Sequence, residues 1–269
     1  MQTLPLLDGH AIPQLGFGLW QIDDSARVTD EALQMGYRLV DGAAIYGNEV
    51  GMGEGIAASG IPRDQIFVTT KVWNDRQGYD STLHAVSESL ARLKLDRLDL
   101  CLIHWPCAAR DQYVDTWRAL IKLQGDGTIT SIGTSNFNAA ELDRLTAETG
   151  VTPVLNQIEL HPEFQQTQLR AAHAQRGIIT QSWTPLGGGK SFTTPTIGSI
   201  AKRLNRTPAQ VVLRWHLDLG LSVIPRSSRK AGLAENLASQ DFTLTAEDMT
   251  AIAGLDEGGR IGPDPAVFG

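Results

Sequence analysis

A regular alternation of short apolar runs with longer amphipathic stretches continues along almost the whole chain, and no other feature limits the fold as strongly. The short runs are rich in β-branched residues and are typical of buried strands, whereas the longer stretches have the apolar spacing of helices that pack on one face. Strands that alternate with helices predict a parallel sheet with its helices outside. Eight such units favour a closed (β/α)8 barrel over an open, doubly wound sheet. The expected strands span 16–19, 37–40, 66–70, 98–103, 129–135, 153–157, 178–183 and 221–224, and the expected helices span 25–35, 50–59, 81–93, 113–123, 139–149, 167–176, 207–219 and 231–238.

Two segments lie outside the eight units. At the N-terminus, 3–13 contains the Asp-Gly pair at 8–9, which favours the turn of a β-hairpin. Near the C-terminus, 245–255 has helical periodicity and opens on a Thr-x-x-Asp capping pair, ahead of a tail rich in Gly and Pro. The expected fold is therefore an α/β TIM barrel with an N-terminal β-hairpin cap and extra helices near the C-terminus. The length of 269 residues suits a single domain over 1–269, because α/β barrels of about 250 residues fold as one unit.

Composition and charge argue against several partners and locations. The net charge of −7 disfavours binding to nucleic acid or to an anionic membrane, because both need a basic surface. The cysteines Cys101 and Cys107 suggest no disulfide framework, and the N-terminus lacks the basic and apolar regions of a signal peptide. No apolar run approaches the length of about 18 residues that a membrane span needs. We therefore expect a cytoplasmic monomer that binds a small-molecule substrate.

Four residues with chemical functions occupy equivalent places in the pattern. Asp41 ends the second expected strand, Lys71 the third and His104 the fourth. Tyr46 lies in the loop after Asp41, before a helix that Asn48 is expected to cap. Because barrels keep their active sites at the carboxyl ends of the strands, these side chains are expected to converge. A Lys ammonium lowers the pKa of a neighbouring phenol, so Tyr46 is a candidate general acid and His104 a candidate for orienting a carbonyl group that receives a hydride.

Each of the four residues also has an ordinary structural role. Asp41 serves equally well as a helix cap, Tyr46 as a loop anchor, Lys71 as a solvated strand end and His104 as a buried core histidine. For one such residue alone, the structural role is the simpler interpretation. Four of them at equivalent strand ends favour catalysis instead.

Six motifs follow one another along nearly the whole chain: DGAAIYGNE at 41–49, TKVW at 70–73, LIHWP at 102–106, GTSNF at 133–137, NQIELHP at 156–162 and IPRS at 224–227. In this order they resemble the aldo-keto reductase family. Within that family the sequence is most similar to bacterial 2,5-diketo-D-gluconate reductases, through QSWTPLG at 181–187 and PAQVVLRWH at 208–216. The resemblance implies that Asp41, Tyr46, Lys71 and His104 form a catalytic tetrad in which Tyr46 donates the proton.

The resemblance also implies a nicotinamide dinucleotide cofactor, held without a G-x-G-x-x-G motif. Ser135, Asn136 and Gln157 correspond to residues that hold the nicotinamide carboxamide, a group that both donates and accepts hydrogen bonds. Trp183 is expected to stack on the nicotinamide ring. Helix capping by Ser135 and Asn136, and a core role for Trp183, are the alternatives. The other expected cofactor contacts in this part of the barrel are Gly18, Leu19, Asp41, Thr184, Pro185, Leu186 and Gly187, the last of which begins a glycine-rich loop over the pyrophosphate.

A basic stretch follows the eighth expected strand, where barrels bind phosphates. The resemblance assigns it to the adenosine 2′-phosphate of NADPH/NADP+, for which an Arg forms a bidentate contact. Gly232 falls where many relatives carry a second Arg, so NADH is expected as a weaker alternative cofactor. A solvated helix start is the other interpretation of the stretch. The expected contacts are Arg226, Ser227, Ser228 and Arg229 for the phosphate, and Glu235 and Asn236 for the adenine.

Three tryptophans, Trp20, Trp73 and Trp105, each follow a strand end on the same expected rim. Together with Tyr46 and His104 they predict an aromatic-walled substrate pocket, although tryptophans that merely fill loops are the alternative. The surrounding loops are short beside those of steroid-reducing relatives, which favours compact substrates. We therefore expect NADPH-dependent reduction of small aldehydes, ketones and keto-sugar acids of the 2,5-diketo-D-gluconate type to alcohols.

Three alternatives stay open at this point. The same tetrad running in the other direction is a dehydrogenase that oxidises alcohols, and cellular cofactor ratios decide between the two. A non-catalytic barrel subunit that binds NADP is the second alternative, and the complete tetrad argues against it. A metal-dependent barrel hydrolase is the third, although no His and Cys residues show the spacing of metal ligands.

Overall fold

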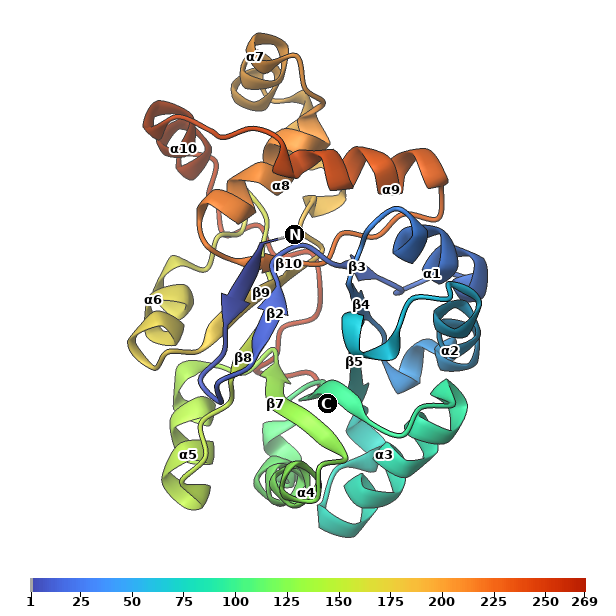
Figure 1. Ribbon diagram of the computed structural model, residues 1–269. Helices are drawn as coiled ribbons and strands as arrows, with labels where there is room; N and C mark the ends of the chain where they lie inside the picture. Colours follow the sequence, from blue (N-terminus) through green and yellow to red (C-terminus); the bar gives the residue numbers. More distant parts are fainter. Residues whose placement is uncertain (1) are drawn as a thin grey trace.

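Residues 2–269, which the computed structural model describes, form a barrel of eight parallel strands inside a ring of helices (Figure 1). Each strand from β3 to β10 pairs with the next one along the chain. The barrel closes between its first and last strands, where Gly16 N–H donates to Val223 O at 2.9 Å and Gly18 N–H to Pro225 O at 3.1 Å. The expected (β/α)8 TIM barrel is confirmed. Its strands are β3 (Phe17–Gly18), β4 (Leu39–Asp41), β5 (Phe67–Val72), β6 (Leu98–Ile103), β7 (Ile129–Ser135), β8 (Leu155–Glu159), β9 (Ile179–Trp183) and β10 (Ser222–Val223).

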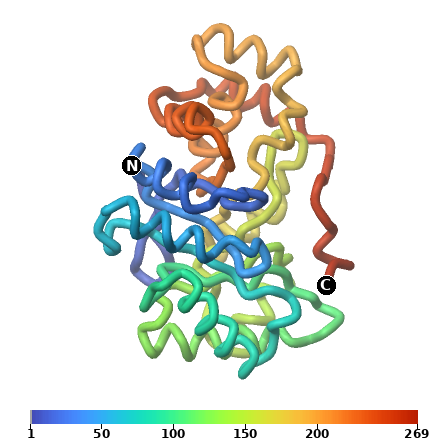
Figure 2. The backbone as a smooth tube through the Cα atoms, turned by 90° about the vertical axis from the view of Figure 1, so that its right-hand side faces the viewer, coloured from blue at the N-terminus to red at the C-terminus, as the bar shows by residue number. Residues whose placement is uncertain are grey.

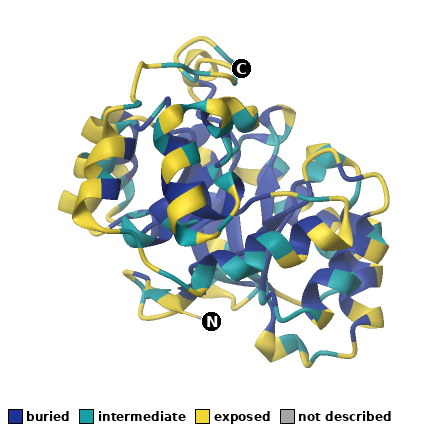
Figure 3. Ribbon diagram, turned by 90° about the horizontal axis from the view of Figure 1, so that it is seen from above, coloured by how far each residue is buried: buried dark blue, intermediate teal, exposed yellow. Residues whose placement is uncertain are grey.

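Helices follow the strands and cover the outside of the barrel. Their outer faces are exposed, while the strands and the helix faces that contact them are buried (Figure 3). Short 3-10 helices lie in several of the loops after the strands, including η1 (Ala44–Tyr46) and the kinked η5 (Gly187–Thr193). The helices are α1 (Ser25–Gln34), α2 (Glu49–Ala58), α3 (Tyr79–Leu93), α4 (Tyr113–Gly125), α5 (Ala139–Thr149), α6 (Thr167–Gln175), α7 (Pro195–Leu204), α8 (Pro208–Asp218), α9 (Lys230–Leu237) and α10 (Ala246–Ala253).

Helices α7 and α10 lie outside the ring: α7 packs on α8, and α10 packs on α7 in the same apolar cluster (Figure 1). Helix α10 was expected, and its capping pair is present, since Thr245 and Asp248 exchange side-chain and backbone hydrogen bonds. Helix α7 was not expected, although the chain carries its local signals. Thr194 accepts from Ile197 N–H as the N-cap, a proline follows directly, and Asn205 ends the helix in the left-handed conformation.

The N-terminal hairpin closes the bottom of the barrel, the end at which the strands begin. As expected, β1 (Thr3–Pro5) pairs with β2 (Ala11–Pro13) in the antiparallel sense. Leu6 and Ile12 pack there against the inward side chains of the strands. The tail after α10 runs along the opposite end of the barrel (Figure 2). The mouth, formed by the carboxyl ends of the strands, is therefore bordered by the loops and the tail. Among residues 2–269, no helix combines the length and apolarity needed to cross a lipid bilayer.

Candidate active site

The four residues of the expected tetrad meet at the mouth of the barrel. Lys71 Nζ lies 2.5 Å from Asp41 Oδ1, 2.9 Å from Gly42 O and 3.3 Å from the Tyr46 hydroxyl. The His104 ring lies edge-on to the Tyr46 ring, with centroids 5.7 Å apart. Asp41 and Lys71 are almost fully buried, whereas Tyr46 is half-buried in η1. The phenol is thus the part of the group nearest to solvent, and the Asp41–Lys71 ion pair lies beneath it.

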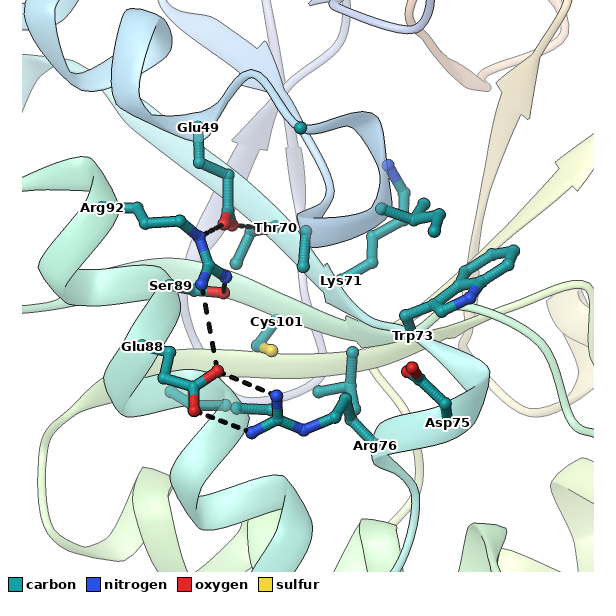
Figure 4. A pocket seen from close by; sticks show the side chains of 16 residues that line it. Glu49, Thr70, Lys71, Trp73, Asp75, Arg76, Glu88, Ser89, Arg92 and Cys101 are labelled. Atoms are coloured by element: carbon teal, nitrogen blue, oxygen red, sulfur yellow. Dashed lines mark hydrogen bonds and ion pairs between the residues drawn. The ribbon is translucent and has the colours of Figure 1, made fainter.

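A second, partly buried ion pair and a hydrogen bond hold the Tyr46 loop against β5. Glu49, at the start of α2, is 1% exposed and accepts from Thr70 Oγ1 at 2.6 Å and from Arg92 Nε at 2.7 Å. Figure 4 shows these three side chains meeting at one side of a cavity of about 310 Å³ that Lys71 also lines. Because Thr70 directly precedes Lys71, the hydrogen bond from Thr70 to Glu49 holds the Tyr46 loop beside the strand that carries Lys71.

Asn48 holds the other side of the same loop. It occupies the N-cap position of α2, as expected, but its side chain makes no capping hydrogen bond. Its amide instead donates to Leu19 O at 2.8 Å and to Ile22 O at 3.3 Å, and its own carbonyl accepts from Ser25 Oγ. The capping prediction is therefore wrong in its mechanism, because two carbonyl groups of the loop after β3 compete for the amide. This contact ties the Tyr46 loop to the loop that carries Trp20.

Burial and charge shift the pKa values of the tetrad in different directions. Burial is the largest single effect on Lys71 and alone would lower its pKa, but the charges and hydrogen bonds of Asp41 and Tyr46 together outweigh it, so the pKa is raised and the ammonium stays charged. Burial raises the pKa of Tyr46; Lys71 acts in the lowering direction, as expected, but does not reverse the shift. The expected net lowering is thus contradicted, because desolvation of the phenolate dominates. Burial, followed by the charge of Lys71, places the pKa of His104 well below its usual value, so its imidazole is neutral near pH 7.

The amide and hydroxyl side chains expected at a cofactor are gathered beside the tetrad. Asn136 Nδ2 donates to His104 O at 2.9 Å and to Ser135 Oγ at 3.0 Å, while Trp183 Nε1 donates to Asn136 Oδ1 at 2.9 Å. Gln157 Nε2 donates to Asp41 Oδ2 at 2.7 Å. These donors and acceptors lie around one end of the mouth, and they fit a ligand amide because both kinds of partner are present.

The remaining residues expected near the nicotinamide and the pyrophosphate border the same mouth. Leu19 N–H donates to Asp41 O at 2.9 Å, so the end of β3, with Gly18, lies directly beside the tetrad. Thr184, Pro185 and Leu186 connect β9 to η5. The glycine-rich loop that starts at Gly187 contains short 3-10 turns on either side of a kink, where Gly188 and Gly189 have left-handed backbone conformations.

The basic stretch is exposed at the side of the mouth next to the Trp20 loop. Arg226 Nη1 donates to Trp20 O at 3.1 Å and to Gln21 Oε1 at 2.8 Å. Ser227 Oγ accepts from Arg229 N–H at 3.2 Å, which shapes the turn before α9. Gly232 packs against this turn, because a Cβ there would lie 2.3 Å from Ser227 Oγ. An Arg at 232 would therefore require the Ser227 side chain to move. Of the other expected contacts, Ser228 is exposed before α9, Glu235 is partly buried and Asn236 is buried within that helix.

Aromatic rings line the substrate side of the mouth. The Trp20 ring contacts Tyr46 at 5.2 Å and the Trp73 ring contacts His104 at 4.9 Å between centroids. Trp105 lies 4.6 Å from Phe268, a tail residue that the sequence did not single out. The three expected tryptophans do converge, and the tail adds a fourth ring. The only available signal for Phe268 was an aromatic residue at the end of a tail otherwise rich in Gly and Pro.

A buried cluster on β8 and the loop after it anchors the tail, and no role was predicted for it. His161 lies between two carboxylates, 3.1 Å from Glu159 Oε1 and 3.0 Å from Glu163 Oε2. Glu159 also accepts from Ile261 N–H at 2.6 Å and from Gly262 N–H at 2.9 Å. Burial alone would lower the pKa of His161, but its hydrogen bonds with the two carboxylates outweigh burial and raise it. Both glutamates have lowered pKa values, because the bonds they accept outweigh their desolvation.

Comparisons with known proteins give the following matches. The Aldo/keto reductase family model matches residues 14–257. The methylglyoxal reductase DkgA of Yersinia pestis is 49% identical, over 100% of this chain and 98% of that protein. The solved structure of a Gox0644 variant in complex with NADPH is 49% identical, with a TM-score of 0.96 over 100% of this chain and 98% of that chain. A Bombyx mori aldo-keto reductase in complex with NADP is 35% identical, with a TM-score of 0.92 over 96% of this chain and 94% of that chain.

Proposed function

Because the chain belongs to the aldo/keto reductase family and is an NADP(H)-dependent oxidoreductase of that family, we propose that it reduces small, reactive carbonyl compounds to alcohols. The observation that carries this proposal is the position of Lys71 Nζ, between Asp41 Oδ1 at 2.5 Å and the Tyr46 hydroxyl at 3.3 Å. A phenol held in this way at the mouth is suited to give its proton to a carbonyl oxygen. The proposed substrates are methylglyoxal, simple aldehydes and keto-sugar acids such as 2,5-diketo-D-gluconate.

Each residue of the tetrad has a separate role in the proposed reaction. When bound, the reduced nicotinamide supplies the hydride. Tyr46 hydrogen-bonds to the carbonyl oxygen and transfers its proton, and the Lys71 ammonium stabilises the phenolate that remains. Asp41 holds Lys71 in place and keeps it charged. The neutral imidazole of His104 donates a second hydrogen bond that orients the carbonyl group.

The cofactor assignment rests on the donors and acceptors around the mouth. Ser135, Asn136 and Gln157 would hold the carboxamide, with the Trp183 ring beside the nicotinamide. Arg226 and Arg229 are exposed where a 2′-phosphate would lie, so NADPH is the proposed cofactor and NADH a weaker one. The proposal includes a cytoplasmic monomer acting as a single domain.

The choice of compact substrates rests on the four rings at the mouth. Trp20, Trp73, Trp105 and Phe268 lie around the phenol and the imidazole, which favours a compact ligand over a polycyclic one. Arg260, a cation in the tail, makes a cation–π contact with the Phe164 ring, 4.6 Å from its centroid. A sugar acid would therefore depend on the tetrad for its polar contacts.

A panel of substrates tests the proposal. We would measure kcat/KM for methylglyoxal, 2,5-diketo-D-gluconate, a benzaldehyde and a 3-ketosteroid, each with NADPH and with NADH. The proposal expects the small dicarbonyls and aldehydes to lead and NADPH to be preferred. A leading ketosteroid would contradict the compact pocket, and no turnover of any carbonyl would remove the reductase assignment.

A further inference from the structure

A chain of buried polar side chains crosses the barrel interior and ends at the tetrad. Ser222 on β10, Gln181 on β9 and Gln157 on β8 are register neighbours, so their side chains point inward at the same level. Gln181 Nε2 donates to Ser222 Oγ at 2.9 Å, and Gln157 Nε2 donates to Gln181 Oε1 at 2.6 Å and to Asp41 Oδ2 at 2.7 Å. Gln181 and Ser222 are fully buried and do not reach the mouth themselves.

The charge of the tetrad fixes the direction of every hydrogen bond in this chain. An ionised carboxylate only accepts, so Asp41 requires an N–H from Gln157. The second N–H of that amide points at Gln181, which must therefore present its oxygen. The N–H groups of Gln181 are then left for Ser222, whose hydroxyl accepts one of them. With both N–H groups of Gln157 engaged, its carbonyl oxygen is the part left for a ligand.

We infer that Gln181 is a positioning residue, which acts on the cofactor and on Asp41 through the amide of Gln157. The inference rests on the proposed function, because it takes the nicotinamide carboxamide as the ligand of Gln157. Two acceptors, Asp41 and Gln181, hold the two N–H groups of the amide nitrogen. Without Gln181, one buried N–H of Gln157 loses its partner and the amide is free to turn about its remaining bond to Asp41.

Cofactor analogues give the sharpest test, because they separate orientation of Gln157 from general stability. An NADPH analogue with an acetyl group in place of the carboxamide has no N–H to offer to the oxygen of Gln157. Wild-type protein should therefore bind NADPH more tightly than this analogue, by roughly three- to tenfold for one neutral hydrogen bond. Dissociation constants would be measured by quenching of tryptophan fluorescence, so that binding is read without turnover.

Three variants complete the experiment. Gln181→Met keeps the shape of the side chain but removes its acceptor, and should erase most of the preference for NADPH while lowering kcat. Gln181→Glu keeps an acceptor for Gln157, and the Ser222 hydroxyl can turn to donate to the new carboxylate, so the preference should be retained. Thr180→Val is the matched control: Thr180 is buried on the same strand but bonds to His173, away from the tetrad, so this change should leave the preference unaltered.

The outcomes separate the two proposals. A Gln181→Met variant that keeps the wild-type preference, or a Gln181→Glu variant that loses it, would overturn the positioning role. If Gln181→Met does not fold, Gln181→Leu, which also lacks an acceptor, replaces it in the comparison with Gln181→Glu. Equal binding of NADPH and the analogue by wild-type protein also overturns the inference, because Gln157 then makes no bond to the carboxamide. Tight, selective NADPH binding without reduction of any carbonyl would remove the proposed function and leave the role of Gln181 intact.

Discussion

Replacing His161 with Gln should destabilise the protein at mildly acidic pH and leave its stability unchanged in alkali. A charged imidazole gives one N–H to Glu159 and one to Glu163, whereas an amide in its place gives an N–H to one carboxylate and turns its oxygen to the other. The variant therefore loses one charge-assisted hydrogen bond in a buried cluster. Such a bond contributes about 1.5–3 kcal/mol. At roughly 2–4 °C per kcal/mol for a chain of this size, the melting temperature should fall by about 3–12 °C.

The pH dependence follows from the directions of the pKa shifts. The folded-state pKa of His161 is raised above 6.5, so its stabilising contribution is fully present below pH 6.5 and is lost as the pH rises through the folded value. The pKa values of Glu159 and Glu163 are lowered from 4.5, so their contributions are present above pH 4.5 and are lost as the pH falls through the folded values. The cluster is thus most stabilising between about pH 4.5 and 6.5. A neutral imidazole donates to only one of the two carboxylates, as the amide does, so the two proteins should converge at high pH.

Urea unfolding of wild-type and His161→Gln protein at pH 5.5, 7 and 9 measures this difference directly. His84→Gln is the matched control, because His84 is exposed on α3 and the same chemical change there should alter neither stability nor its pH dependence. A difference of the same size at all three pH values would refute the reasoning, since it would mean that His161 is not charged between its carboxylates. No difference at pH 5.5 would mean that the cluster contributes no net stability.

Three further changes probe the mouth of the barrel. Tyr46→Phe should lower kcat by about 10²- to 10⁴-fold with little change in NADPH affinity, because only the phenolic proton is lost; near wild-type turnover would exclude Tyr46 as the donor. Arg226→Ala should weaken NADPH binding by about tenfold or more and leave NADH binding unchanged, which titrations with both cofactors would show; equal losses would move Arg226 away from the 2′-phosphate. Phe268→Ala should raise KM for a benzaldehyde and improve kcat/KM for a 3-ketosteroid, because the ring that packs on Trp105 and Trp73 is gone; an unchanged panel would separate the tail from substrate selection.

The parts that could be predicted from sequence are those that the topology alone determines. Parallel strands with outer helices put all carboxyl ends at one mouth, so the strand-end residues Asp41, Lys71 and His104 had to be neighbours once the barrel was recognised. Tyr46 follows for the same reason, since its loop starts at Asp41. The strands that pair are short and consecutive along the chain, and hydrophobic periodicity identifies such strands well.

The sequence could not predict contacts between distant parts of the chain, or which of several hydrogen-bond partners a side chain would choose. The bond from Ile261 N–H to Glu159 joins residues 102 positions apart and has no local signal. The side chain of Asn48 has the chemistry of an N-cap, but it hydrogen-bonds to the carbonyl groups of Leu19 and Ile22 instead. The net direction of the Tyr46 pKa shift could not be predicted either. The sequence indicates that Lys71 lowers this pKa, but only the structure shows the burial that outweighs the effect of Lys71.

The raised pKa of Tyr46 is consistent with a proton donor and also says how far the site is prepared before the substrate arrives. A general acid must hold its proton until the carbonyl oxygen develops negative charge. Burial keeps the phenol protonated near pH 7, and Lys71, whose charge Asp41 maintains, lowers the cost of losing that proton during the reaction. The loop that carries Tyr46 is held from both sides, by Glu49 and by Asn48, so the phenol does not have to be reoriented for transfer. The site is therefore arranged for the charge that appears at the transition state rather than for an ionised phenol at rest.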